Sequence, residues 1–287
     1  MTHVYEREVL AHFHSLVTYA IIAFVLLFVG IFTHGINLTG AAPNFGYALN
    51  SSSTLFLFAV PVLTMRSIAE ERRQKTDILL YSLPISLTQV VLGKYLAMCT
   101  VLLVPIAVMC AYPLVLGLFG DSLLGAAYST IFAFFLLGAA LLSIGMFISA
   151  LTDNQAMAAV LTFLVMLISF YLNFLATSIS GTADASLVAL SIVAGFVGLI
   201  VVISTNSKIA GIVTTASGIG ALAIVRLLFA STLEGLFPSI IRRLSIFERF
   251  SVFVAGEFDI AAIVYFSTVI AVFLFLTVQT MEKRRYN

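Results

Sequence analysis

The sequence predicts an all-α fold, a polytopic transmembrane helical bundle of about eight spans that forms one transmembrane domain over residues 1–287. Hydrophobic residues make up 61% of the chain and charged residues only 9%, whereas about half of a soluble domain is apolar and about a quarter is charged. The mean hydropathy of +1.14 agrees with this composition. Apolar stretches of about 20 residues, the length of one crossing, recur along the chain.

Eight apolar stretches are long enough to cross a membrane, and they lie near residues 17–36, 51–66, 95–118, 125–150, 156–178, 187–204, 209–230 and 258–280. The sixth and the seventh are the weakest. A six-span arrangement, in which residues 187–230 do not form two spans, therefore stays open. Both arrangements return the C-terminus to the side of the membrane on which the chain starts.

The distribution of Lys and Arg predicts that both termini are cytoplasmic, because cytoplasmic loops carry an excess of positive charge. An inside N-terminus places ten of the 14 cations in the cytoplasm: Arg7, Arg66, Arg72, Arg73, Lys75, Lys94, Lys208, Lys283, Arg284 and Arg285. Arg226 lies near the outer end of a span, where its side chain can reach the membrane surface; a role in substrate binding is the alternative.

Residues 4–20 predict an interfacial helix that lies along the inner leaflet and turns into the first span. Apolar residues recur there at helical spacing, and most of the polar residues fall off this stripe. The alternative is an irregular start of the first span. No small-residue cleavage site follows, so we expect the first apolar segment to remain as a membrane anchor.

Residues 65–90 predict a cytoplasmic region, because a dense run of charge cannot lie in hydrocarbon. The run contains Arg66, Glu70, Glu71, Arg72, Arg73, Lys75 and Asp77. Glu71 precedes Lys75 by four residues in the order that favours a helix, and Pro84 and Ser86 end it. A short loop would be enough to join the second and third spans. The connection is longer than that, which favours a docking helix over an ordinary solvated loop.

Two further loops carry polar or amphipathic patterns. Thr152 and Gln155 have the spacing of a capping box, which predicts a tight turn before the fifth span; residues 152–155 serve either this structural role or a secondary contact with a cytoplasmic partner. Residues 236–256 are amphipathic and predict an outer-face helix or a half-inserted pair of helices.

No catalytic or metal-binding pattern emerges from the sequence. Gly93 and Lys94 are followed by Tyr95 and lack the glycine of a phosphate-binding loop, so we expect no ATP site of that kind. His12 and His14 are two residues apart, on different sides of a helix, which argues against a metal pair. We therefore expect no enzyme activity in this chain, no metal, and no nucleic-acid partner.

Four segments carry a resemblance to a known family: LTMRSIAEERRQKTDILLYSLPIS, VVLGKYLA, IGMFISALTDNQAMAAVLTF and FDIAAIVYFSTVIAVFLFLTVQTMEKRR. Together they resemble the membrane subunit of ABC-2 type transporters, and are most similar to the gliding-motility branch, to which permeases for nitrous-oxide-reductase maturation are related. The family has six spans as a rule. The apolar stretch at 187–230 looks like two more.

The resemblance implies roles for positions already described. The helix from Met65 to Leu80 matches the coupling helix that binds the ATPase, with Arg66, Glu70, Glu71, Arg72, Arg73, Lys75, Thr76 and Asp77 as coupling residues. Val4 to Ala20 match the interfacial elbow helix, and Leu236 to Gly256 match the outer re-entrant helices. Thr152, Asp153, Asn154 and Gln155 would form the secondary cytoplasmic contact.

The resemblance also implies a function and partners. We expect a permease in a bacterial or archaeal inner membrane that needs no cofactor of its own. Two copies of a separate ATPase would bind ATP and Mg²⁺ and drive export of a lipid-linked, peptide or saccharide substrate. A mechanical or regulatory subunit that acts on an extracytoplasmic auxiliary protein is the alternative, and an intramembrane enzyme is a third hypothesis.

The resemblance further implies a pair of permeases, either two copies of this chain or this chain with a related one. Because the spans contain few polar residues, we expect association through close packing of small residues. Ala23 and Gly30 in the first span and Ala158 and Ala159 in the fifth form the predicted seam.

Overall fold

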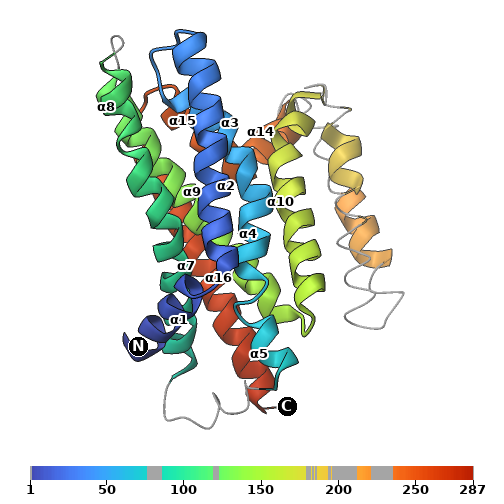
Figure 1. The fold of residues 1–287 in the computed structure, drawn as a ribbon. Coiled ribbons are helices and arrows are strands. Elements are labelled where there is room, and N and C mark those ends of the chain that lie inside the picture. The colour runs from blue at the N-terminus through green and yellow to red at the C-terminus, as the bar shows by residue number, and fades with distance from the viewer. Residues whose placement is uncertain are drawn as a thin grey trace. The chain divides into compact units, whose positions relative to one another are not determined.

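The computed structural model describes residues 2–75, 86–118, 123–178, 182, 184, 186–192, 195, 212–220 and 235–286, and the regular elements in these ranges are all helical. They are α1 (Thr2–Phe13), α2 (Leu16–Phe32), the π-helix η1 (Thr33–Thr39), α3 (Gly46–Ser52), the short 3-10 helix η2 (Ser53–Leu55), α4 (Phe56–Thr64), α5 (Ala69–Arg73), α7 (Leu87–Met109), α8 (Tyr112–Leu116), α9 (Leu124–Leu151), α10 (Gln155–Ser178), α14 (Leu236–Leu244), α15 (Ile246–Val254) and α16 (Ile260–Tyr286) (Figure 1).

The chain divides into two compact units. The first comprises residues 1–170 and 249–287 and holds the bundle described below. The second comprises residues 171–248 and includes the end of α10 and the whole of α14. Residues 186–192 and 212–220 of the second unit are helical.

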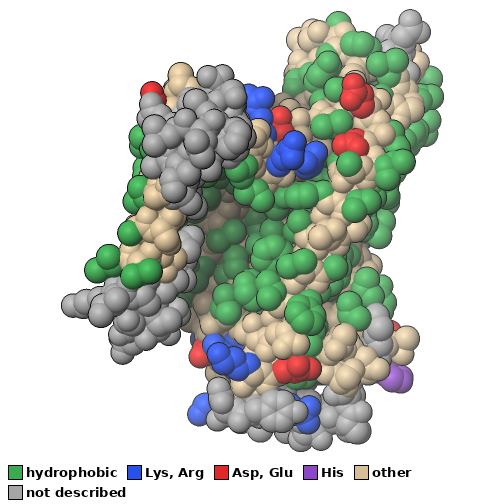
Figure 2. Space-filling model, turned by 180° about the vertical axis from the view of Figure 1, so that it is seen from behind, with side chains coloured by type: hydrophobic (Ala, Val, Ile, Leu, Met, Phe, Trp, Pro, Cys, Tyr) green, Lys and Arg blue, Asp and Glu red, His purple; other side chains and the backbone are tan. Residues whose placement is uncertain are grey.

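Within the described ranges, six helical segments are long and apolar enough to cross a membrane: Leu16–Thr39, Gly46–Arg73, Leu87–Leu116, Leu124–Leu151, Gln155–Leu172 and Ile260–Arg285. They correspond to six of the eight predicted spans. The other two predicted spans, 187–204 and 209–230, fall largely outside the described residues. Lys, Arg, Asp and Glu side chains lie toward the two ends of the face shown in Figure 2, with mainly hydrophobic side chains between them.

Helix α9 is the core of the first unit. In its most apolar stretch, 78% of the residues are buried, and the helix contacts α3, α4, α5, α7, α8 and α16. Glycines permit this close packing. A Cβ atom built on Gly138 would lie 2.6 Å from Leu102 Cδ2, and one on Gly145 would lie 2.5 Å from Thr64 Oγ1. Both distances are too short for a side chain, so these two positions of α9 require glycine.

The amphipathic segment 236–256 forms two short helices, α14 and α15. In α15, Phe250 and Phe253 are fully buried, and the Phe250 ring lies 5.8 Å from that of Phe134 in α9. The C-terminal end of α15 is held by side chains that donate to its carbonyl groups: Asn44 Nδ2 to Val254 O at 2.7 Å and Thr130 Oγ1 to Phe253 O at 2.9 Å. The chain then turns at Gly256, whose φ of +87° favours glycine.

Two predicted helix boundaries and one residue of the predicted seam differ from the structure. The interfacial helix ends at Phe13 rather than residue 20, because Ser15 is extended (φ −90°, ψ 124°) and begins α2. The single helix from Met65 to Leu80 is wrong over its described part, because only α5 is helical there and Lys75, with a φ of +56°, cannot continue it. The predicted seam is wrong at Ala158, which is fully buried within its own chain.

Candidate functional site

One end of the first unit gathers the charged residues that the sequence singles out. We call it the charged end: it carries α1, α5, the turn at residues 152–154 and the C-terminal turn of α16 (Figure 1). The residues come from these four parts of the sequence and from the beginning of α7 (Leu87–Met109). Their contacts divide them into buried anchors and an exposed turn.

Helix α5 is attached to the end of α9 through its backbone. The first N–H groups of a helix have no partner within the helix, and Ser149 Oγ accepts hydrogen bonds from Ile68 N at 3.3 Å and Ala69 N at 3.1 Å. Ser149, Ile68 and Ala69 are all almost fully buried. A hydroxyl on α9 therefore caps α5 and attaches it to α9.

Lys94 of α7 joins three helices through what we call the Lys94 cluster, which consists of Arg7, Glu8, Glu71 and Lys94. The Lys94 side chain is only 3% exposed, and its Nζ donates to Glu71 Oε1 at 2.7 Å and Glu8 Oε1 at 3.1 Å. Arg7 lies 2.8 Å from Glu8 and 3.6 Å from Glu71. These contacts connect α1, α5 and α7. A buried ammonium group requires such partners, because its desolvation costs several kcal/mol.

Helix α1 packs directly on α7 beside this cluster. A Cβ atom on Gly93 would lie 3.0 Å from Val4 Cγ1, and the Tyr5 and Thr100 hydroxyl oxygens are 2.9 Å apart. Gly93 thus allows α1 to approach closely enough for Glu8 to reach Lys94.

The electrostatic environment of α1 reflects these contacts. Burial opposes ionisation of Glu8, but the charge of Lys94 and the hydrogen bonds from Arg7 and Lys94 outweigh it and lower the pKa of the Glu8 carboxyl below 4.5. The hydrogen bond to Glu8 raises the pKa of Arg7. Burial lowers the pKa of His12, with Lys94 and Arg66 adding to the effect and Glu8 opposing it.

Asp153 is the centre of a second group, the Asp153 cluster, which consists of Arg72, Asp153 and Arg284. The side chain of Arg72 is 4% exposed and lies 3.7 Å from Asp153 Oδ1, and it also donates to Ala150 O. Arg284 Nη1 donates to Asp153 Oδ1 at 2.6 Å and Arg284 Nη2 to Leu151 O at 2.9 Å. The carbonyl groups at the C-terminus of α9 thereby receive cationic donors from α5 and α16.

The remaining described coupling candidates face outward. Arg73, Gln74 and Lys75 are exposed and form what we call the cationic turn. Arg66 is exposed as well and lies 3.9 Å from Glu70, which also accepts a hydrogen bond from Gln74. Glu71 and Arg72, between these residues in sequence, point into the two clusters instead. Adjacent residues of α5 thus serve as anchors and as exposed surface.

The structure places the sequence-predicted site residues in different roles. Arg66, Glu70, Arg73 and Lys75 are at or near the surface, Glu71 and Arg72 are anchors, and Thr76 and Asp77 lie outside the described residues. The proposed pairing of Glu71 with Lys75 is replaced by the contact of Glu71 with Lys94, because Lys75 leaves the helix.

The turn at residues 152–155 contains both a confirmed and a wrong prediction. It is tight, since α9 ends at Leu151 and α10 begins at Gln155. The capping box is wrong: Asn154 Oδ1 accepts the hydrogen bond from Ala156 N at 2.9 Å and caps α10. The buried Thr152 Oγ1 has no hydrogen-bond partner within the described chain. Asp153 makes the ion pairs described above.

Glu8 and Ser149 are parts of this site that the sequence did not indicate, and Arg7, Lys94 and Arg284 were predicted only as cytoplasmic cations. A sequence signal existed only for Lys94, a cation at the boundary of a long apolar span. Ser149 lies in the last turn of α9, just before the polar turn at residues 152–155, but nothing in its surroundings in the sequence indicates that it caps a distant helix.

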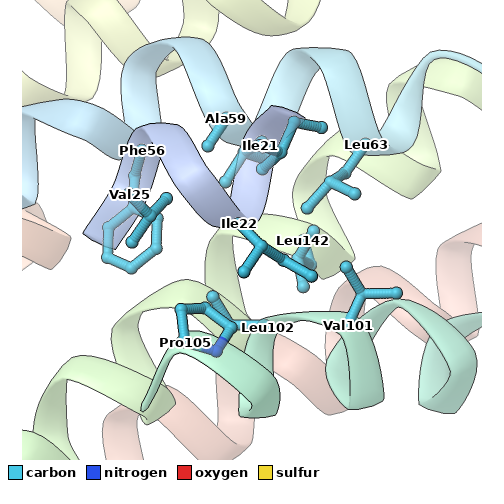
Figure 3. Close-up of a pocket in the computed structure, with 11 residues that line it drawn as sticks. Ile21, Ile22, Val25, Phe56, Ala59, Leu63, Val101, Leu102, Pro105 and Leu142 are labelled. Atoms are coloured by element: carbon cyan, nitrogen blue, oxygen red, sulfur yellow. The ribbon is translucent and has the colours of Figure 1, made fainter. Parts of the chain in front are cut away.

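The interior of the bundle contains a small apolar cavity between α2, α4, α7 and α9. Ile22 and Val25, Phe56, Leu102 and Leu142 are among the residues that surround it (Figure 3). Its free volume is about 10 Å³, the lower limit for one water molecule, and its lining offers no polar partner. This cavity is a packing defect and is too small for a substrate.

The fold and the charged end define a multi-pass membrane protein with two ion-pair clusters at one end. Residues 10–188, more than half of the chain, match the family described as ABC-2 family transporter protein. The chain belongs to this family. None of the curated proteins matches it in sequence. The family makes the chain a membrane subunit of an ABC transporter and implies an ABC-type ATPase as its partner.

Proposed function

We propose that this chain is the permease subunit that couples ATP hydrolysis by a separate ATPase to movement of the membrane-spanning helices. ATP and Mg²⁺ would be bound by the ATPase. Family membership supports the permease assignment. The observation that carries the coupling role is the cationic turn, which is exposed for contact yet is adjacent to two residues anchored in the bundle.

The two clusters offer a route by which force on α5 reaches four other helices. Glu71 connects α5 through Lys94 to α7 and through Arg7 and Glu8 to α1. Arg72 connects it to the end of α9, and Asp153 extends this connection to Arg284 of α16. Because the side chains of Lys94 and Arg72 are almost fully buried, loss of their contacts would leave a buried charge unpaired, which costs several kcal/mol. Closure of an ATPase against α5 would move these helices as a group.

The wider assembly follows from the same proposal. Two ATPases would bind at the charged end, which would be cytoplasmic together with both termini, in the inner membrane of a bacterium or archaeon. The chain would pair with a second copy or a related permease and export an amphipathic or lipid-linked substrate, with an extracytoplasmic auxiliary protein as a further partner. The quoted segments support placement in the gliding-motility branch.

Charge reversal in the cationic turn tests this function. The variant Arg73→Glu with Lys75→Glu changes two exposed side chains, so it should leave the bundle folded while weakening binding of the ATPase that co-purifies with the chain. ATPase activity in reconstituted vesicles should then lose its stimulation by the permease. Arg242→Glu with Arg243→Glu in α14 is the matched control, because these arginines are equally exposed and belong to the predicted outer segment.

Full binding and stimulation with the Arg73/Lys75 variant would refute the coupling role. Reversing the charges of Glu71 and Arg72 would be a poorer test. Both side chains are anchors, so their loss would disturb folding as well as coupling.

A further inference from the structure

A groove of about 650 Å³ runs between α7 and α16. Thr88, Val91 and Leu92 line it from α7, and one face of α16 from Ser267 to Glu282 lines it from the other side. Ser267 and Ala271 are the small residues of this face. The volume falls within the range of about 300–1,000 Å³ that is typical of small-molecule sites. The groove belongs to the first unit and is separate from the cavity in Figure 3.

The lining changes in character along the groove. Its middle is apolar, with Ile270, Leu274, Phe275 and Val278, whereas Thr88, Gln279 and Glu282 lie toward the charged end. Both helices are long and apolar enough to span a membrane. The groove therefore has an apolar part at the depth of lipid tails and a polar part at the depth of lipid headgroups.

The carboxylate of Glu282 indicates which kind of molecule the groove would bind. No ion pair or hydrogen bond satisfies its carboxylate within the described part of the chain, and it lies in the last turns of α16, where the helix dipole disfavours negative charge. No Lys or Arg lines the groove. An unpaired carboxylate at the mouth of an apolar groove is complementary to a cationic group attached to an apolar chain.

We propose that this groove binds a phospholipid with a primary amine in its headgroup, such as phosphatidylethanolamine. One acyl chain would lie along Ala271 and Leu274, and the amine would contact Glu282, with Thr88 and Gln279 as further hydrogen-bond partners. A lipid at this position would fill the space between α7, which carries Lys94, and α16, which carries Arg284. The proposal does not depend on the coupling role, since it rests on the groove alone.

Native mass spectrometry of the full chain, released from nanodiscs of phosphatidylethanolamine or phosphatidylglycerol, tests the proposal. The unaltered chain should retain phosphatidylethanolamine in preference. Ala271→Phe and, independently, Ser267→Phe should reduce retention about tenfold, since overpacking costs about 1–3 kcal/mol. Val272→Phe is the matched control: Val272 is 47% exposed on the same helix and does not line the groove.

The headgroup contact is tested by Glu282→Gln, which should reduce the preference for the amine lipid about threefold, the effect of a partly exposed ion pair. Glu257→Gln, at the other end of α16, should leave the preference unchanged. Equal retention by the Ala271, Ser267 and Val272 variants would overturn the proposal, as would equal retention of the two lipids by the unaltered chain. A disulfide between two copies through cysteines placed at Ala271 would show that protein, not lipid, occupies the groove.

Discussion

Lys94 shows why single residues of this protein are difficult to interpret from sequence. Its carboxylate partners, Glu8 and Glu71, are 86 and 23 residues away in the chain, so no local pattern indicates that the side chain is buried and paired. A run of charge predicts an aqueous location, and Arg66, Arg73 and Lys75 of this run are exposed. It does not show which of the charges contact the protein and which face the solvent.

Replacement of Lys94 by Met should destabilise the protein. Removing the ammonium group leaves the carboxylates of Glu8 and Glu71 with Arg7 as the remaining cation of the cluster, at a cost of about 3 kcal/mol. Lys283→Met is the control, because Lys283 is exposed. Thermal or denaturant unfolding in detergent measures the difference; equal stability of the two variants would mean that the Lys94 cluster contributes little.

His12 should titrate below its ordinary pKa of 6.5, since burial and the nearby cations Lys94 and Arg66 disfavour its protonated form. Glu8 opposes this shift, so Glu8→Gln should lower the pKa of His12 further. The unfolded chain binds this proton at higher pH than the folded chain, so folding stability should decrease as the pH falls from 6.5 through the lowered pKa.

Nuclear magnetic resonance of labelled histidine rings, assigned with a His12→Gln variant, measures the pKa directly. The His12→Gln variant should also lose this component of the pH dependence of unfolding. A His12 pKa at or above 6.5 would contradict the packing of α1 on the bundle.

At the scale of elements, apolar length was a sufficient signal for the six described spans but not for the short helices between them. The break at Ser15 and the end of α5 depend on backbone angles and on contacts with α7 and α9. The cap of α10 is similar: Thr152 and Asn154 are both plausible capping residues, and the geometry of the turn selects Asn154. Such choices depend on tertiary contacts that local spacing does not contain.

The packing of α9 against α4 gives a prediction about elements. Gly145→Ala should destabilise the bundle by about 1–3 kcal/mol, because the added methyl group meets Thr64, which is itself fully buried. Gly125→Ala is the control in the same helix: no atom lies within 4 Å of its added Cβ, so the higher helix propensity of Ala should leave stability unchanged or raise it by up to about 1 kcal/mol. Equal effects of the two substitutions on unfolding would show that α9 and α4 are not closely packed.

At the scale of the whole molecule, the described spans, the charged end and the family match support one account. A membrane-embedded bundle presents a cationic turn to a partner and connects that turn to α1, α7, α9 and α16 by two ion-pair clusters. Composition was enough to predict the membrane bundle. The division of the charged run into anchors and exposed surface required the structure, because the anchors are defined by residues from distant parts of the sequence.

The accessibility of a cysteine at Gln74 tests this account most directly. Gln74 is exposed in the cationic turn, and Cys99 and Cys110 would first be replaced so that no other thiol reacts. With a membrane-impermeant maleimide, the account predicts labelling in inside-out vesicles only, and protection when the ATPase is bound. A cysteine at Glu257 should show the opposite sidedness and no protection. Labelling of Gln74→Cys from outside, or full labelling in the presence of bound ATPase, would contradict the central claim.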